Sequence, residues 1–153
     1  MTIAEEPKMG RFSIEVELSN HKDLVLSEAG HLSPQQIRRT KIRGVVDSGA
    51  TRLVIPESVV KQLGLETSGT AKVRYADGRT SERLIVKDVH LAYGGRESVF
   101  SAVVEPGRDS ILVGAIVMEE LDFLVDCIGL RLVPRDANQI VSESEGYDEM
   151  VVI

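Results

Sequence analysis

The stretch GVVDSGATRLVIPESVVKQLGL, residues 44–65, joins an apolar strand-like run, a loop of small residues and a short amphipathic segment. The apolar run ends at Asp47, and Ser48 and Gly49 follow directly. Burying a lone carboxylate costs on the order of several kcal/mol unless hydrogen bonds or a shared proton compensate. Asp47 therefore either makes a turn, for which Asp, Ser and Gly are ordinary ingredients, or performs chemistry.

The whole chain has 153 residues, which predicts one domain with a real core. Its composition is that of a globular protein, with 42% apolar and 27% charged residues. A net charge of −6, 4% aromatic residues and no tryptophan argue against nucleic-acid and anionic-membrane partners. The basic cluster Arg38–Arg43 is interrupted by uncharged residues, so we interpret it as the solvated face of a strand.

Cys127 is the one cysteine, so no intramolecular disulfide can form and a reducing compartment is expected. Its neighbours Val125 and Ile128 predict a small core residue. The first ten residues lack the apolar segment of a signal peptide, and no run approaches the roughly 20 apolar residues of a membrane span. We therefore expect a cytoplasmic protein.

Alternating apolar residues and turn signals predict an all-β domain of many short strands with two short helices, that is, a barrel or a sandwich. No βαβ alternation and no long repeat is visible. We expect a tail over residues 1–10, a domain over 11–136 and an acidic tail over 137–153. The expected elements are strands at Arg11–Ser19, around Leu24–Leu26 and at Arg38–Asp47, a helix from Pro56 to Gly64, hairpin turns at Asp77-Gly78 and Gly94-Gly95, a helix over Ala115–Leu121 and two later strands.

Metal and nucleophile motifs are missing from the sequence. His21, His31 and His90 are scattered and never spaced as two ligands on one helix. No Gly-x-Ser-x-Gly elbow and no glycine-rich phosphate loop occurs. The sequence thus predicts no metal and no cofactor, and Asp47 remains the candidate for chemistry.

The residues around Asp47 resemble the active-site region of the retropepsin-like (retroviral-type) aspartic proteases, in particular small bacterial members with a single domain. The family signature Asp-Ser/Thr-Gly-Ala is matched from Asp47 to Ala50. A second family landmark, apolar residues followed by glycine and a helix, is similar to Ile111–Gly114 with AIVMEEL after it. The resemblance implies a closed barrel with one or two short helices, the acid protease fold, with half of an active site per chain.

The same resemblance implies an aspartic endopeptidase that hydrolyses peptide or protein substrates. Such an enzyme needs two carboxylates about 3 Å apart that share one proton. The chain holds one Asp-Ser-Gly, so a homodimer would pair Asp47 with its own copy. The implied site comprises the catalytic Asp47, the active-site loop Ser48, Gly49, Ala50 and Thr51, the flap Tyr75, Ala76, Asp77 and Gly78, and the second loop Val113 and Gly114.

Two positions depart from the family pattern. Ala115 follows Gly114 where many members have a charged or polar residue, and Arg52 stands close behind the signature, where it either influences the dyad or faces solvent. The alternative to an enzyme is a catalytically inactive module that kept this fold for dimerisation or peptide binding. The intact Asp-Ser-Gly-Ala signature favours the enzyme.

Overall fold

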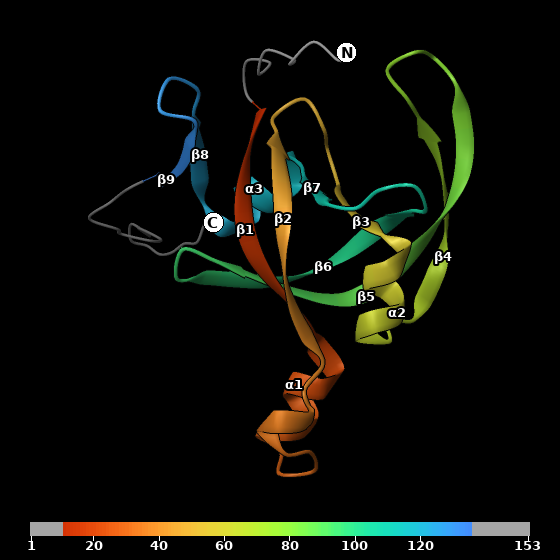
Figure 1. Cartoon of the computed structure of the whole chain (residues 1–153), viewed down its shortest axis with the longest axis vertical. Coiled ribbons are helices and arrows are strands. Elements are labelled where there is room, and N and C mark those ends of the chain that lie inside the picture. The colour runs from red at the N-terminus through yellow and green to blue at the C-terminus, as the bar shows by residue number, and fades with distance from the viewer. Residues whose placement is uncertain (1–10, 136–153) are drawn as a thin grey trace, which may run out of the picture.

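The computed structural model describes residues 11–135. The predicted N-terminal tail and the predicted acidic C-terminal tail lie outside the described residues. The described residues form β-strands, three short α-helices and connecting turns (Figure 1). The predicted all-β class is therefore confirmed.

Six strands close into a barrel because the first strand pairs on both sides. Hydrogen bonds connect the strands in the order β1-β2-β7-β3-β6-β5, and β5 pairs back with β1. Strand β4 extends the sheet beyond β5 as its outer member. The strands are β1 (Arg11–Asn20), β2 (Arg39–Asp47), β3 (Leu53–Pro56), β4 (Thr67–Arg74), β5 (Thr80–Tyr93), β6 (Arg96–Glu105) and β7 (Ile111–Val113).

The core fills the interior of this barrel. In β1 the predicted alternation places Val16 and Leu18 inside, at 2% and 0% exposure. Helix α2 (Glu57–Leu63) adds two buried residues and ends at Gly64, whose φ of 63° suits a left-handed cap. Helix α3 (Ala115–Leu121) also packs against this core, and β8 (Phe123–Asp126) pairs with β9 (Arg131–Pro134) in a separate small sheet.

The strand expected around Leu24–Leu26 is wrong, because these residues lie in a third helix, α1 (His21–Glu28). The side chain of Asn20 caps this helix by accepting the backbone N–H of Asp23 at 3.1 Å. Val25 and Leu26 are 48% and 44% exposed, so their apolar character marks no buried strand. Helix α1 projects from the end of the barrel opposite to the start of β1 (Figure 1).

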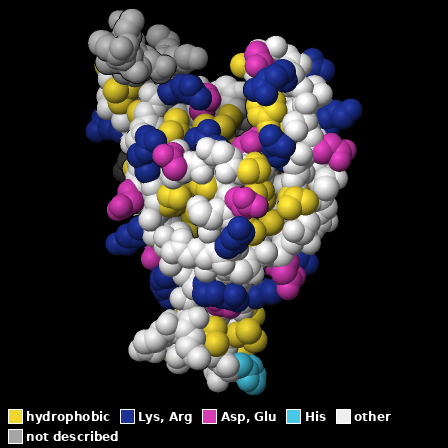
Figure 2. Space-filling model, turned by 45° about the vertical axis from the view of Figure 1, so that its right-hand side comes forward, with side chains coloured by type: hydrophobic (Ala, Val, Ile, Leu, Met, Phe, Trp, Pro, Cys, Tyr) yellow, Lys and Arg dark blue, Asp and Glu magenta, His cyan; other side chains and the backbone are white. Residues whose placement is uncertain are grey.

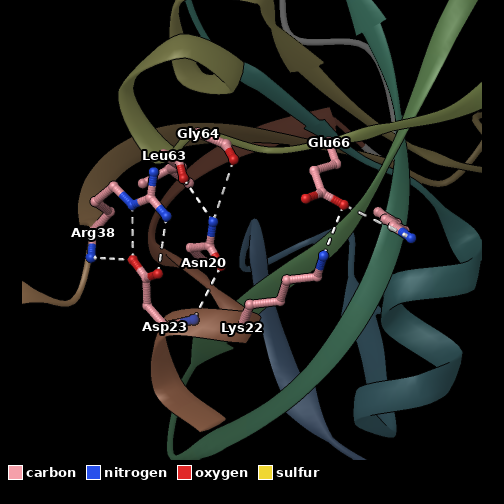
Figure 3. Close-up of polar contacts among 8 residues, drawn as sticks. Asn20, Lys22, Asp23, Arg38, Leu63, Gly64 and Glu66 are labelled. Atoms are coloured by element: carbon pink, nitrogen blue, oxygen red, sulfur yellow. Dashed lines mark hydrogen bonds and ion pairs between the residues drawn. The ribbon is translucent and has the colours of Figure 1, made fainter. Parts of the chain in front are cut away.

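Asp23, although buried, is held by Arg38 at the base of α1 (Figure 3). Its carboxylate accepts three hydrogen bonds from Arg38: from the side-chain Nε at 2.8 Å, from Nη2 at 2.9 Å and from the backbone N–H at 2.9 Å. These bonds from Arg38 hold the pKa of Asp23 below its usual value. Asn20 also donates to the carbonyl of Leu63 at 2.8 Å, which joins α1 to the end of α2.

In the basic cluster Arg38–Arg43, Arg38 differs from the exposed basic residues that follow it because it pairs with a buried carboxylate. Arg39, Lys41 and Arg43 are exposed along β2, as the solvated strand face predicts. Arg38, in contrast, is the partner that Asp23 needs in order to be buried.

Cys127 is exposed, so its predicted place in the core is wrong. It stands in the turn between β8 and β9, where Asp126 accepts the backbone N–H groups of Ile128 and Gly129. This turn carries Ile128 into solvent as well, at 96% exposure. The apolar neighbours of Cys127 mark a hairpin rather than a core segment.

Candidate active site

Asp47 ends β2 at a place where three strands meet. Strand β7 runs parallel to β2, with Val46 opposite Val113, and antiparallel to β3, with Leu112 opposite Val54. The strands before and after the Asp47 loop are therefore both fastened to β7. This arrangement fixes the loop at residues 48–52 by strand pairing on both sides.

The second predicted landmark lies directly against this loop. The backbone N–H of Ala115 donates to the carbonyl of Ala50 at 2.8 Å, and that of Ile116 donates to Thr51 at 3.0 Å. A Cβ atom on Gly114 would lie 2.5 Å from the carbonyl oxygen of Arg52. Gly114 is required because the two loops approach so closely, and Ala115 contributes through its backbone.

The carboxylate of Asp47 makes a turn and also faces a cleft. Its Oδ1 accepts the backbone N–H of Gly49 at 2.9 Å, and its carbonyl accepts the N–H of Ala50. Its Oδ2 lies 3.0 Å from Nη2 and 3.1 Å from Nε of Arg11. With 21% of the side chain exposed, the carboxylate remains accessible. Asp47 can therefore both form the turn and take part in chemistry.

The cleft beside Asp47 has a volume of about 830 Å³. Gly49, Ala50 and Thr51 line one side of it, and Tyr75 and Ala76 contribute from the β4–β5 hairpin. The space-filling view shows the hollow at the upper end of the molecule, beside this hairpin (Figure 2). Of the predicted site residues, Ser48, Asp77, Gly78, Val113 and Gly114 do not line it.

The hairpin predicted as the flap is tied to the end of β6. The Tyr75 hydroxyl donates to Oε2 of Glu105 at 2.5 Å, and Arg83 Nε donates to Oε1 of the same carboxylate at 3.0 Å. The hydrogen bond to Glu105 raises the pKa of Tyr75. Arg79 and Arg83 also lie 5.1 and 5.9 Å from the centroid of the Tyr75 ring. Asp77 and Gly78 form the turn itself, with φ of 89° at Gly78.

Several residues of the cleft were missed by reasoning from the sequence. Arg11 opens a predicted strand, but only the pairing of β1 with β2 sets it opposite Asp47. Glu105 and Arg108 flank a turn after β6 and have no motif around them. Within residues 11–135 no group of three or more His, Cys, Asp or Glu side chains could hold a metal ion. No helix in the same range has the length and apolar character of a bilayer span.

Comparison with known proteins places this geometry in context. A family model described as "Aspartyl protease" matches residues 34–125, which is more than half of the chain. The structure of EIAV protease complexed with the inhibitor HBY-793 aligns with a TM-score of 0.53 and 15% identity, covering 87% of this chain and 99% of that one. At this identity the match shows the fold alone: the barrel is that of a retroviral protease.

A second solved structure is the foamy viral protease-reverse transcriptase in complex with an RNA/DNA hybrid. It aligns with a TM-score of 0.44 and 20% identity over 53% of this chain, and the match spans only 10% of that longer chain. No curated protein matches the sequence.

Proposed function

Because the chain belongs to the retropepsin-like family of aspartyl proteases, we propose that it is an aspartic endopeptidase that works as a homodimer. One observation carries the proposal. Asp47 of the Asp-Ser-Gly-Ala signature presents a partly exposed carboxylate to a cleft of about 830 Å³. The substrate would be a peptide or protein segment that lies between the Asp47 loop and the β4–β5 hairpin.

The proposed dimer follows from the number of carboxylates. Asp126, which also follows an apolar strand, lies in the β8–β9 hairpin and does not line the cleft that Asp47 faces, so we do not take it as the second catalytic group. The second carboxylate would be the Asp47 of the partner subunit, brought close by a two-fold axis. Two carboxylates about 3 Å apart share one proton, which reduces the free-energy cost of burying them.

In the proposed reaction, the ionised carboxylate of the dyad takes a proton from a bound water as the water oxygen attacks the scissile carbonyl carbon. The protonated carboxylate donates a hydrogen bond to the carbonyl oxygen, which gains charge. The tetrahedral intermediate then collapses: the C–N bond breaks, and a dyad proton passes to the leaving nitrogen. The products are a new carboxyl terminus and a new amino terminus.

The cellular location that best fits an exposed cysteine is the cytoplasm. The exposed thiol of Cys127 stays reduced there, whereas an oxidising compartment would favour disulfides between chains. Labelling of intact and permeabilised cells with a thiol reagent that cannot cross membranes tests this location.

The direct test is cleavage of a mixed peptide library from acidic to neutral pH by the wild type and by the Asp47→Asn variant. We expect cleavage by the wild type and none by the variant, with circular dichroism showing that both are folded. If neither cleaves at concentrations where sedimentation shows a dimer, the chain is a binding module on a protease fold.

The dimer is tested by mixing subunits. If each active site needs two copies of Asp47, added Asp47→Asn chains reduce activity more than dilution does, because mixed dimers are inactive. A loss in simple proportion to the added variant would point to a site within one chain.

A further inference from the structure

The cleft has a positive charge that opposes the charge of the whole chain. The chain carries a net charge of −6, yet the basic residues that line the cleft outnumber the acidic ones. The acidic residues are Asp47 and Glu105, and the basic residues are Arg11, Arg52, Lys72, Arg74 and Arg108. Lys and Arg side chains, with fewer acidic ones among them, surround the upper end of the molecule where the hollow lies (Figure 2).

Both acidic residues of the cleft already form ion pairs with arginines. Asp47 is paired with Arg11, and Glu105 accepts from Arg83 and from the Tyr75 hydroxyl. Neither carboxylate forms an ion pair with Arg52, Lys72, Arg74 or Arg108.

The remaining cations have no acidic partner among residues 11–135. Arg52, Lys72 and Arg74 are exposed and form no ion pair with the acids that the structure describes. Arg108 is half-buried and donates only to neutral groups, from Nε to the carbonyl of Ser110 at 2.9 Å and from Nη2 to its hydroxyl at 3.2 Å.

Arg108 also lies near other positive charges. Burial, followed by the charge of Arg11, lowers its pKa, and Arg43 acts in the same direction. Asp109 and Glu105 act in the opposite direction without reversing the shift. A bound anion would relieve this repulsion.

We propose that the cleft selects peptide segments that carry Asp or Glu side chains beside the cleaved bond, with Arg52 and Arg108 as specificity-determining residues. This inference rests on the proposed endopeptidase function. An acidic side chain in the cleft exchanges its hydration for charge-assisted hydrogen bonds with a guanidinium, and the positive field of the cleft also speeds the encounter. A two-fold dimer would present the same cations on both sides of the scissile bond.

The test uses pairs of labelled peptides that differ only in Asp and Glu against Asn and Gln. Binding is measured by fluorescence anisotropy with the non-cleaving Asp47→Asn chain, so the result does not depend on turnover. Two ion pairs, one to the exposed Arg52 and one to the half-buried Arg108, predict about tenfold tighter binding of the acidic peptide at low salt, and a much smaller difference at about 0.5 M salt. Equal binding of the two peptides overturns the proposal whatever the protein variants do.

The protein side is tested by Arg52→Gln and Arg108→Gln, singly and together, against Lys61→Gln. Lys61 is an exposed residue of α2 outside the cleft, so its loss removes the same charge from another surface. We expect the preference for the acidic peptide to fall in each single Arg variant and further in the double variant, and to persist in the Lys61 variant. Equal loss in the three single variants would mean that net charge, not the cleft, sets the preference.

Cleavage of the same peptide pairs by the wild type separates the two proposals. A higher kcat/KM for the acidic peptide supports both. Cleavage of both peptides at equal rates rejects the selectivity and keeps the endopeptidase. Selective binding with no cleavage of any peptide rejects the endopeptidase. A separate competition experiment uses a single-stranded oligonucleotide. If the oligonucleotide competes as strongly as the acidic peptide does, the cleft binds polyanions in general and is not selective for acidic peptides.

Discussion

The guanidinium of Arg11 lies 3.0 Å from Oδ2 of Asp47, although 36 positions separate the two residues in the chain. Arg11 begins β1 and Asp47 ends β2, so the antiparallel register places them opposite each other. Each chain thus carries its aspartate together with a compensating cation. In the proposed dimer, this cation would stabilise the single negative charge that remains on the two carboxylates after they share a proton.

Replacing Arg11 by Gln should therefore weaken the dimer at neutral pH, because the negative charge of the paired carboxylates would be buried without a compensating cation. We expect the dimer dissociation constant from sedimentation equilibrium to rise several-fold, and Arg11→Lys to restore part of the affinity. Arg39→Gln, at the exposed far end of β2, is the matched control. A dissociation constant unchanged by Arg11→Gln would show that the ion pair has no part in assembly.

Gly114 should tolerate no side chain. A Cβ there would lie within 2.8 Å of three backbone atoms of Thr51 and Arg52, so the loops must separate. We expect Gly114→Ala to reduce the free energy of unfolding by about 1–3 kcal/mol in urea titrations and to abolish cleavage. Gly69→Ala is the control, because a Cβ at Gly69 meets nothing within 4 Å. Full activity of the Gly114 variant would show that the contact between the loops can relax.

The Tyr75–Glu105 hydrogen bond should hold the β4–β5 hairpin beside the cleft. Removing the hydroxyl in Tyr75→Phe frees the hairpin, so we expect KM to rise several-fold with a smaller change in kcat, and faster hydrogen exchange in the hairpin. Tyr93→Phe, outside the cleft, is the matched control. Unchanged KM and exchange in Tyr75→Phe would mean that pairing with β5 alone positions the hairpin.

The Asp23–Arg38 pair predicts a loss of stability in acid. The pKa of Asp23 is lower in the folded chain than in the unfolded one, so the unfolded state binds the proton first as pH falls. The stabilisation is complete above the unfolded value of about 3.9 and is lost as pH falls through the folded value.

Asp23→Asn should accordingly reduce the free energy of unfolding at pH 7 by about 2 kcal/mol, which is less than the roughly 3–5 kcal/mol for breaking a fully buried pair because Arg38 is half exposed. In urea titrations, the difference from the wild type should shrink below about pH 4. Glu28→Gln, an exposed charge on the same helix, should leave stability nearly unchanged. A difference that is constant from pH 7 to pH 3 would contradict the assignment to this carboxylate.

Local patterns were sufficient for most elements of the barrel. Alternation in β1, the Asp77-Gly78 and Gly94-Gly95 turns and the helix that ends at Gly64 were all correct, because each signal depends on nearby residues. Two failures have a common cause. The strand expected at Leu24–Leu26 and the core position expected for Cys127 were inferred from apolar neighbours. The conformation there is decided instead by backbone N–H groups that donate to the side-chain oxygens of Asn20 and Asp126.

The sequence by itself determined the aspartate that carries the family signature, the strand that delivers it and the β class of the domain, because these depend on residue type and short spacing. Only the tertiary structure decided what surrounds that aspartate. Strand register brings Arg11 to Asp47, and parallel pairing with β7 sets the Gly114 loop against the Asp47 loop. The tertiary structure also places Arg52 and Arg108 in one cleft. Such neighbours are distant along the chain, and their approach depends on the closure of the barrel rather than on any local preference.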